Sequence, residues 1–183
     1  MTQVLTRHIV LIGMMGAGKT AIGSELARRL RVPFTDSDAE IEVAAAMSSR
    51  EIFARDGEAF FRAREAQVLS RLLAGAPGVV STGGGAWMRP ENRQIIGERG
   101  LSVWLNCSPE TLWARVRQRP TRPLLQTADP KGTLLRLLAE RSPVYALADL
   151  EFVSRAGDTI EATATRLIAE LTAAHPTLTQ EKP

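Results

Sequence analysis

The chain has 183 residues, of which 44% are hydrophobic and 23% charged, and its formal net charge is +3. These values are typical of one globular domain, and the weak net charge with interleaved signs argues against a nucleic-acid-binding protein. The single cysteine excludes an intrachain disulfide, and no apolar run is long enough for a membrane span or a signal peptide. We therefore expect a cytoplasmic monomer with no membrane partner.

The first predicted strand and the loop after it form a phosphate-binding motif. An apolar strand at residues 8–12 precedes GMMGAGKT at residues 13–20, which fits the pattern G-x-x-x-x-G-K-[ST], and a helix follows to about Leu30. Glycines let the N–H groups of such a loop surround a polyphosphate, Lys19 adds a positive charge, and the Thr20 hydroxyl can bind Mg²⁺. A chance glycine-rich turn would not need a strand and a helix in this order. We expect a nucleoside triphosphate to contact Gly16, Ala17, Gly18, Lys19, Thr20 and Ala21.

Two carboxylates follow the second predicted strand, near residues 32–35. If the backbone stays extended, Asp36 and Asp38 point to the same face and lie near the phosphate loop. One could hold Mg²⁺ through water, and the other could accept a proton or a hydrogen bond from a substrate hydroxyl. An aspartate with the ordinary pKa of about 3.9 is ionised at neutral pH. Helix capping by Asp38 explains this residue equally well on its own, and only the phosphate loop in the same sheet favours a functional role.

Helices are predicted next at residues 39–46, 50–54 and 59–73. Arg62 and Arg64 lie in the third of these helices. Because residues two apart lie on different faces of a helix, we expect at most one of these arginines to point into the cleft. The alternative is that both are ordinary solvated surface arginines.

A glycine triplet, Gly83–Gly85, follows the strand predicted at residues 78–82. Three glycines let a ligand approach the backbone closely and offer N–H donors, whereas a merely flexible turn seldom needs three. Further along, the sequence predicts a helix at residues 90–98, a strand at residues 101–105 and a helix from Ser108 to about Gln118.

A basic, proline-rich segment at residues 119–132 interrupts the alternation of strands and helices. A segment of this length inside a compact domain is usually a functional lid or disordered, and we place a lid at about residues 115–132. Its arginines can supply positive charge to a transition state beside a triphosphate, although two of them, Arg117 and Arg119, can also be a solvated helix end. The four arginines are Arg115, Arg117, Arg119 and Arg122.

The rest of the chain predicts a helix at residues 133–141, a strand at residues 151–154 and a last helix that begins after Asp158. Arg141 ends the first of these helices, where it could simply complement the helix dipole. Residues 175–183 read as a polar, frayed tail.

Strands that alternate with helices predict an α/β protein, in which a parallel sheet is flanked by helices and joined by right-handed crossovers. Ligands of such sheets bind at the carboxyl ends of the strands. Each motif described above lies at that edge.

Taken together, these motifs resemble the shikimate kinase family from His8 to about Leu171. The matching segments are GMMGAGKT (13–20), DSD (36–38), DGEAFFRARE (56–65), STGGGA (81–86), RPLL (122–125) and ERSPVY (140–145). The resemblance implies a P-loop NTPase fold like that of nucleoside monophosphate kinases, with five parallel strands, in a single kinase domain at residues 1–174. It also implies Mg²⁺-dependent transfer of phosphate from ATP to the 3-hydroxyl of shikimate, in aromatic amino-acid biosynthesis.

On the nucleotide side, the resemblance assigns a role to five residues. Lys19 and Arg122 would be catalytic and would hold the phosphates. Arg115 would stack near adenine. Thr20 would bind Mg²⁺ directly, and Asp36 would bind it through water.

On the substrate side, the resemblance implies that shikimate contacts four residues. Asp38 would be catalytic as the base or as the group that orients the hydroxyl. Arg62 and Arg141 would hold the carboxylate, to which a forked guanidinium group is well suited. Gly84 would offer a backbone contact.

Two other functions remain open at this point. Another small-molecule kinase of the same fold, such as a gluconate kinase, would share the phosphate loop but has no need for Arg62 and Arg141 around a carboxylate. A nucleotide-binding regulatory module without transferase activity would need neither Asp38 nor an arginine-rich lid.

Overall fold

The computed structural model describes residues 3–119 and 125–181, in which it forms one five-stranded sheet and one two-stranded sheet. The strands of the larger sheet are β2 (His8–Ile12), β3 (Phe34–Asp36), β4 (Val79–Ser81), β5 (Gly100–Asn106) and β6 (Leu150–Val153). They lie in the order β3-β4-β2-β5-β6, and every pair of neighbours is parallel. The predicted class, α/β with five parallel strands, is confirmed.

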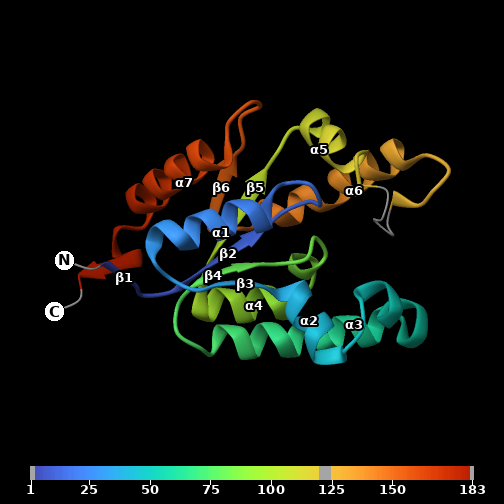
Figure 1. Ribbon diagram of the computed structural model, residues 1–183, viewed down its shortest axis with the longest axis horizontal. Coiled ribbons are helices and arrows are strands. Elements are labelled where there is room, and N and C mark those ends of the chain that lie inside the picture. Colours follow the sequence, from blue (N-terminus) through green and yellow to red (C-terminus); the bar gives the residue numbers. More distant parts are fainter. Residues whose placement is uncertain (1–2, 120–124, 182–183) are drawn as a thin grey trace.

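The helices are α1 (Lys19–Leu30), α2 (Ser37–Ala45), α3 (Ser49–Leu73), α4 (Pro90–Arg99), α5 (Pro109–Val116), α6 (Pro130–Tyr145) and α7 (Ile160–Ala174), with a short 3₁₀ helix, η1 (Ala86–Met88). They cover both faces of the larger sheet (Figure 1). α1 packs with α7 on one face, and α3 packs with α4 on the other. Within the part of the chain that the structure describes, none of these helices combines the length and apolar character that a membrane span requires.

β2 is the central strand and is buried along its whole length. Its Ile9 lies opposite Val79 of β4 on one side and Leu101 of β5 on the other. A parallel strand covered by helices on both faces is expected to be apolar throughout, as this one is. The chain leaves β2 at Ile12 and enters the phosphate loop directly, so the central, fully buried strand of the sheet supports that loop.

The helices predicted at residues 50–54 and 59–73 form one element, α3. It begins with a capping box, in which the Ser48 hydroxyl accepts from the Glu51 N–H and the Glu51 side chain accepts from the Ser48 N–H. At Gly57 the backbone turns to a φ of 83°, which a glycine adopts readily, and the helix changes direction there. The kink replaces the loop that separated the two predicted helices.

The helix predicted at residues 133–141 is longer at both ends. It starts at Pro130 because the Asp129 side chain accepts from the Gly132 N–H at 2.9 Å and a proline suits the first helical position. It continues past Arg141 to Tyr145, with Pro143 inside its last turn. The end predicted at Arg141 was wrong because burial of Tyr145 in the core offsets the hydrogen bond that a proline cannot make.

The polar tail predicted at residues 175–183 is folded as far as the structure describes it. A 3₁₀ turn at Pro176–Leu178 leads into β7 (Thr179–Glu181), which pairs antiparallel with a first strand, β1 (Gln3–Leu5). The tail prediction was wrong because backbone pairing and two buried leucines, Leu5 and Leu178, hold this two-stranded sheet. Polar side chains at most of its other positions hide that signal in the sequence.

His8 makes the fold less stable at acidic pH. The ring is buried at the start of β2, where Nδ1 accepts from the Gly78 N–H at 3.2 Å and Nε2 lies 3.3 Å from the Gly75 carbonyl oxygen. Burial lowers the pKa of His8 below its ordinary value of 6.5. The unfolded chain therefore takes up a proton at a higher pH than the folded chain, so stability is lost as the pH falls below the ordinary value and levels off below the folded-state pKa.

We expect His8→Asn, whose amide oxygen can still accept from the Gly78 N–H, to remove this part of the acid sensitivity. The free energy of unfolding of the wild type should fall more steeply between about pH 7 and about pH 5 than that of the variant. Urea unfolding across this range measures both curves, and the carboxylates common to the two proteins cancel in the difference. Parallel curves would contradict the assignment.

Candidate active site

A cavity of about 640 Å³ opens at the carboxyl ends of the strands. The phosphate loop and the start of α1 form one side, and the ends of β3 and β4 form its floor. Its far end is lined by Asp158, Ile160 and Thr163 around the start of α7. The phosphate loop, the two aspartates and the start of the glycine triplet therefore meet in one cavity, as the position of ligands in parallel sheets predicts.

The phosphate loop turns on glycines that side chains would obstruct. Gly16 and Gly18 have φ values of 82° and 89°, and a Cβ at Gly16 would lie 2.7 Å from Cγ1 of Val116. α1 begins at Lys19, so its positive N-terminal end faces the loop. The Lys19 ammonium donates to the carbonyl oxygens of Gly13 and Met14 at 2.8 and 2.9 Å. Its charge is thus held over the loop.

Asp36 joins three elements at the floor of the cavity. Its Oδ2 accepts from the Thr20 hydroxyl of α1 and from the Ser81 hydroxyl of β4, both at 2.9 Å. Its Oδ1 accepts from the N–H groups of Asp38 and Ala39 at 3.0 and 3.3 Å. Asp36 is therefore the N-cap of α2, and the capping role that the sequence offered for Asp38 belongs to Asp36.

Asp38 lies in the first turn of α2 and not on an extended strand, so the premise that placed Asp36 and Asp38 on one strand face was wrong. Both carboxylates still line the cavity, because the helix starts where the strand ends. The carboxylate fits against Gly83, at which a Cβ would lie 2.6 Å from Oδ1 of Asp38. That oxygen is buried and has no hydrogen-bond partner among the described residues.

Burial raises the pKa of Asp38, and the neighbouring Asp36 charge raises it further, while Lys19 and Arg62 act in the opposite direction. The ordinary pKa expected from the sequence was therefore wrong. A carboxylate that is desolvated yet lies between two cations is suited to receive a proton, because its neutral form is brought closer in energy to its charged form.

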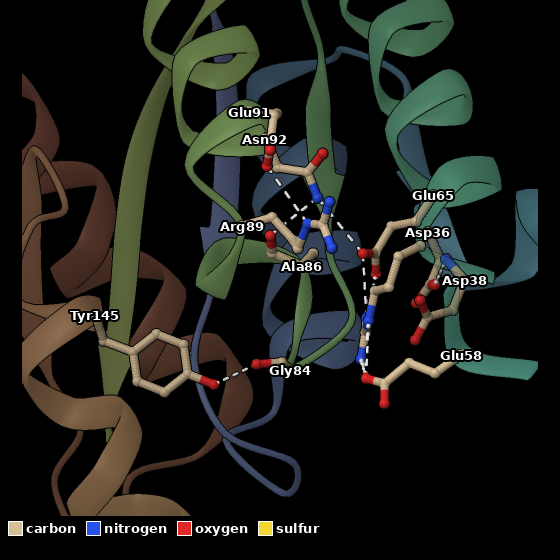
Figure 2. Close-up of polar contacts among 11 residues, drawn as sticks. Asp36, Asp38, Glu58, Glu65, Gly84, Ala86, Arg89, Glu91, Asn92 and Tyr145 are labelled. Atoms are coloured by element: carbon tan, nitrogen blue, oxygen red, sulfur yellow. Dashed lines mark hydrogen bonds and ion pairs between the residues drawn. The ribbon is translucent and has the colours of Figure 1, made fainter. Parts of the chain in front are cut away.

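Arg62 of α3 is held in place by a buried carboxylate. Its Nη1 lies 3.0 Å from Oε1 of Glu65, and Glu65 has no exposed side-chain surface. Asn92 of α4 donates to Glu65 at 3.4 Å and to the carbonyl oxygen of Ala86 at 3.0 Å (Figure 2). The guanidinium lies against Gly85, where a Cβ would be 2.5 Å from Nη2 of Arg62.

Sequence reasoning missed Glu65 and Asn92. Glu65 falls on the stripe that Phe61 and Val68 form at helical spacing, and a glutamate on an apolar face needs a cation beside it. That signal could have identified Glu65 as the partner of Arg62. Nothing local in the sequence marks Asn92, because one partner is a backbone carbonyl, that of Ala86, and the other, Glu65, lies on a different helix.

Arg64 points away from the cavity. Its guanidinium lies 4.9 Å from the centre of the Phe60 ring and donates to Gln67 at 2.9 Å. The prediction that at most one arginine of the pair enters the cleft is confirmed.

Arg141 reaches the glycine triplet from the opposite side. Its Nη1 would lie 3.4 Å from a Cβ at Gly84, and it is buried without a hydrogen-bond partner among the described residues. The Gly84 carbonyl oxygen accepts from the Tyr145 hydroxyl at 2.5 Å (Figure 2). Trp87, to which the sequence assigned nothing, donates from Nε1 to the Val144 carbonyl oxygen at 2.8 Å.

Three lid arginines lie in the described residues. Arg117 is the C-cap of α5, is exposed and does not line the cavity. Arg115 donates to the Gly16 carbonyl oxygen at 3.1 Å and so lies beside the phosphate loop, and Arg119 lines the cavity. Arg122 lies at residues 120–124, outside the described residues.

The site contains no ready-made metal cage: among residues 3–119 and 125–181 no group of three or more histidine, cysteine, aspartate or glutamate side chains could hold an ion. Mg²⁺ usually takes only one or two protein ligands and completes its shell with water and substrate phosphates. The Thr20 hydroxyl and the Asp36 carboxylate, 2.9 Å apart beside the phosphate loop, fit that requirement.

Comparison with known proteins agrees with this geometry. The family model for shikimate kinase matches residues 15–172. A shikimate kinase of Ruegeria pomeroyi is 58% identical over 167 residues, which are 91% of this chain and 86% of that protein. A shikimate kinase of Brucella canis is 47% identical over 170 residues, which are 93% of this chain and 84% of that protein.

Solved structures give the same result. Shikimate kinase from Acinetobacter baumannii in complex with shikimate matches with a TM-score of 0.87 at 35% identity, covering 92% of this chain and 94% of that one. A sugar kinase from Janibacter sp. HTCC2649 has a TM-score of 0.60 at 19% identity, which shows a shared fold alone. Because the family model spans most of the chain and a relative with 58% identity covers 91% of it, this chain belongs to the shikimate kinase family.

Proposed function

We propose that this chain transfers the γ-phosphate of ATP to the 3-hydroxyl of shikimate, giving shikimate 3-phosphate and ADP in aromatic amino-acid biosynthesis. The observation that carries the proposal is the convergence of two guanidinium groups, Arg62 and Arg141, on the glycine triplet of the phosphate-loop cavity. Shikimate carries one carboxylate, and a forked guanidinium group binds a carboxylate with two parallel hydrogen bonds. The relative from Acinetobacter baumannii, which is described in complex with shikimate, supports the assignment.

The nucleotide end of the site follows from the phosphate loop. Loop N–H groups and the N-terminus of α1 face the phosphates, and Lys19 adds its charge. Arg115, already beside the loop, stacks near adenine in this proposal. We assign Arg122 a catalytic role on the phosphates from its place in the RPLL segment, because an arginine can stabilise the negative charge of a phosphoryl-transfer transition state.

We propose Mg²⁺ as the metal of this site, with Thr20 as a direct ligand and Asp36 as a ligand through water. Their hydroxyl and carboxylate oxygens are the donor type that Mg²⁺ prefers. When bound, the ion would neutralise charge on the β- and γ-phosphate oxygens. The hydrogen bond between Thr20 and Asp36 keeps the two side chains together before any ligand arrives.

At the reacting hydroxyl, Asp38 orients the substrate and accepts its proton. The unpartnered Oδ1 is the oxygen available for that contact. Because phosphoryl transfer has a loose transition state, most of the benefit comes from positioning and less from proton abstraction. Arg62 acts on both ends of this arrangement, since it lies against Gly85 and lowers the pKa of Asp38 in opposition to burial.

The setting of the reaction is part of the same proposal. All the residues assigned here come from one chain: the phosphate loop, Asp36, Asp38 and Gly84 line one cavity, and Arg62 and Arg141 lie against the glycine triplet at its edge, which supports a monomer. A buried, unpaired Cys107 and the use of ATP support a cytoplasmic location. We assign residues 1–174 to one kinase domain with a lid at about residues 115–132, to which β7 is joined by its pairing with β1. We propose no nucleic-acid or membrane partner.

Turnover with shikimate and with gluconate separates this proposal from its nearest alternative. We expect Mg²⁺-dependent ADP release with shikimate and none above background with gluconate, because the rigid ring of shikimate holds its hydroxyl at a fixed position relative to its carboxylate, whereas acyclic gluconate has to be ordered on binding. A coupled ADP assay on the purified chain measures both, with chelated metal as the control. A folded protein that releases ADP with gluconate alone would refute the substrate, and one that releases none with either would refute transferase activity.

Replacing Asp38 tests the role of its carboxylate. We expect Asp38→Asn to lower kcat by about 100-fold or more, within the range of a lost general base, while ATP affinity stays nearly unchanged. In the wild type, kcat/KM should fall as the pH drops through the raised pKa of Asp38, at a pH above the ordinary aspartate value of about 3.9. The variant should lack that acid limb. A stable variant with wild-type turnover would show that Asp38 is structural only.

Gly85 tests the placement of Arg62. Its φ of −95° and ψ of −13° suit alanine, so the effect of Gly85→Ala comes from the new Cβ, 2.5 Å from Nη2 of Arg62. We expect KM for shikimate to rise at least about tenfold, since small displacements of a binding group are costly. Gly97→Ala, in α4 where a Cβ meets nothing within 4 Å, is the matched control and should leave KM unchanged. Equal KM values in the two variants would contradict this placement of Arg62.

A further inference from the structure

Tyr145 makes one hydrogen bond to the loop that carries the glycine triplet. Its side chain is buried at the end of α6, and its hydroxyl donates to the Gly84 carbonyl oxygen at 2.5 Å (Figure 2). Burial raises the pKa of this hydroxyl, while the charge of Arg141 and a side-chain hydrogen bond with it act in the opposite direction. The hydroxyl is therefore protonated at neutral pH and remains a donor.

The helix places Tyr145 and Arg141 on the same face, because residues four apart lie one above the other. Both side chains reach Gly84: Tyr145 through its hydroxyl, and Arg141 through Nη1, which would lie 3.4 Å from a Cβ at that glycine. This arrangement exists only because α6 continues past Arg141. A helix that ended at Arg141 would leave the loop without its hydrogen-bond donor.

Two aromatic contacts keep this end of α6 in place. The Tyr145 ring stacks on Trp104 of β5, with ring centres 5.9 Å apart and planes 25° apart. Trp87, which follows the glycine triplet, donates to the Val144 carbonyl oxygen at 2.8 Å. The triplet and the end of α6 are therefore joined at two points, and the tyrosine has little freedom to turn away.

The hydrogen bond to Gly84 also orients a neighbouring donor. The peptide between Gly84 and Gly85 is trans, so its N–H, which belongs to Gly85, points opposite to the carbonyl that Tyr145 holds. Gly85 is the residue against which Arg62 lies. Fixing one peptide plane thus sets the Gly85 N–H relative to Arg62 and sets the distance from Gly84 to Arg141.

We propose that Tyr145 is a positioning residue for recognition of the substrate carboxylate: its hydroxyl fixes the Gly84–Gly85 peptide so that the loop and the guanidinium groups of Arg62 and Arg141 face one anion. The proposal rests on the proposed function for the identity of that anion. Tyr145 is assigned no contact with the ATP phosphates or with the reacting hydroxyl of the substrate. Its effect is therefore confined to binding of the substrate carboxylate.

Tyr145→Phe removes the hydroxyl and keeps the ring on Trp104. We expect KM for shikimate to rise about 5- to 20-fold, as for loss of one buried hydrogen bond, with kcat within about twofold and KM for ATP unchanged. A second substrate, the alcohol in which the carboxylate of shikimate is reduced to hydroxymethyl, sharpens the test. The preference for shikimate over this alcohol in kcat/KM should shrink by about the same factor, because the variant loses recognition of the carboxylate.

Ser102→Ala is the matched control. Ser102 of β5 is also buried and does not line the cavity. Its hydroxyl donates to the Asp149 carboxylate at 2.6 Å. This variant should lose stability without changing KM or the preference for shikimate. Trp87→Phe removes the other hydrogen bond between the segment after the triplet and α6, and it should change KM for shikimate in the same direction as Tyr145→Phe. This variant replaces Tyr145→Phe in the test if Tyr145→Phe does not fold.

The outcomes separate the two proposals. A wild-type chain that does not phosphorylate shikimate would refute the proposed function and this inference with it. A wild type that does so, with Tyr145→Phe equal to it in KM for shikimate and in preference over the alcohol, would refute the inference alone. A variant that lost affinity for shikimate and for the alcohol by the same factor would show a general structural role and would also overturn it.

Discussion

The site depends on the register of three parallel strands. Ser81 of β4 lies opposite Leu11 of β2 and Asp36 of β3, so the three strands end almost level. A shift of one residue would turn side chains to the other face of the sheet and separate Asp36 from the Ser81 and Thr20 hydroxyls that it joins at 2.9 Å. Because β2 is fully buried, this register is strongly determined. Packing in the core thus places the metal-binding oxygens next to the phosphate loop.

Several charged side chains of the site are already buried in the protein without a ligand. Oδ1 of Asp38 and Nη1 of Arg141 have no hydrogen-bond partner among the described residues, and burying polar atoms in this way costs stability. Glu65, by contrast, is fully buried but paired with Arg62. The buried charge of Glu65, which holds Arg62 in place, is therefore paired within the protein. The atoms of Asp38 and Arg141 that face the substrate have no such partner in the part of the chain that the structure describes. A ligand with a hydroxyl and a carboxylate at its two ends would satisfy both.

Local sequence patterns predicted the parallel sheet and the phosphate loop, whereas the roles of the substrate-side residues came from the family resemblance and stay predictions. They succeeded where a feature is set by neighbours in the chain, as with GMMGAGKT or the choice of one arginine from Arg62 and Arg64. They failed where distant contacts decide: α6 extends to Tyr145 because that ring is buried, and β7 forms because it pairs with β1 across the length of the chain. Asp36 took the capping role proposed for Asp38 because α2 begins at Ser37 and not at residue 39 as the pattern indicated.

The central claim is that Arg62 and Arg141, from two separate helices, recognise one carboxylate in the phosphate-loop cavity. Calorimetric titration of wild type, Arg62→Lys and Arg141→Lys with shikimate and with its hydroxymethyl analogue tests it most directly, since lysine keeps the charge but loses the fork. The account predicts that the wild type binds shikimate at least about 100-fold more tightly than the analogue, and that either substitution removes most of this difference. Substitutions that weaken binding of both ligands equally would contradict it.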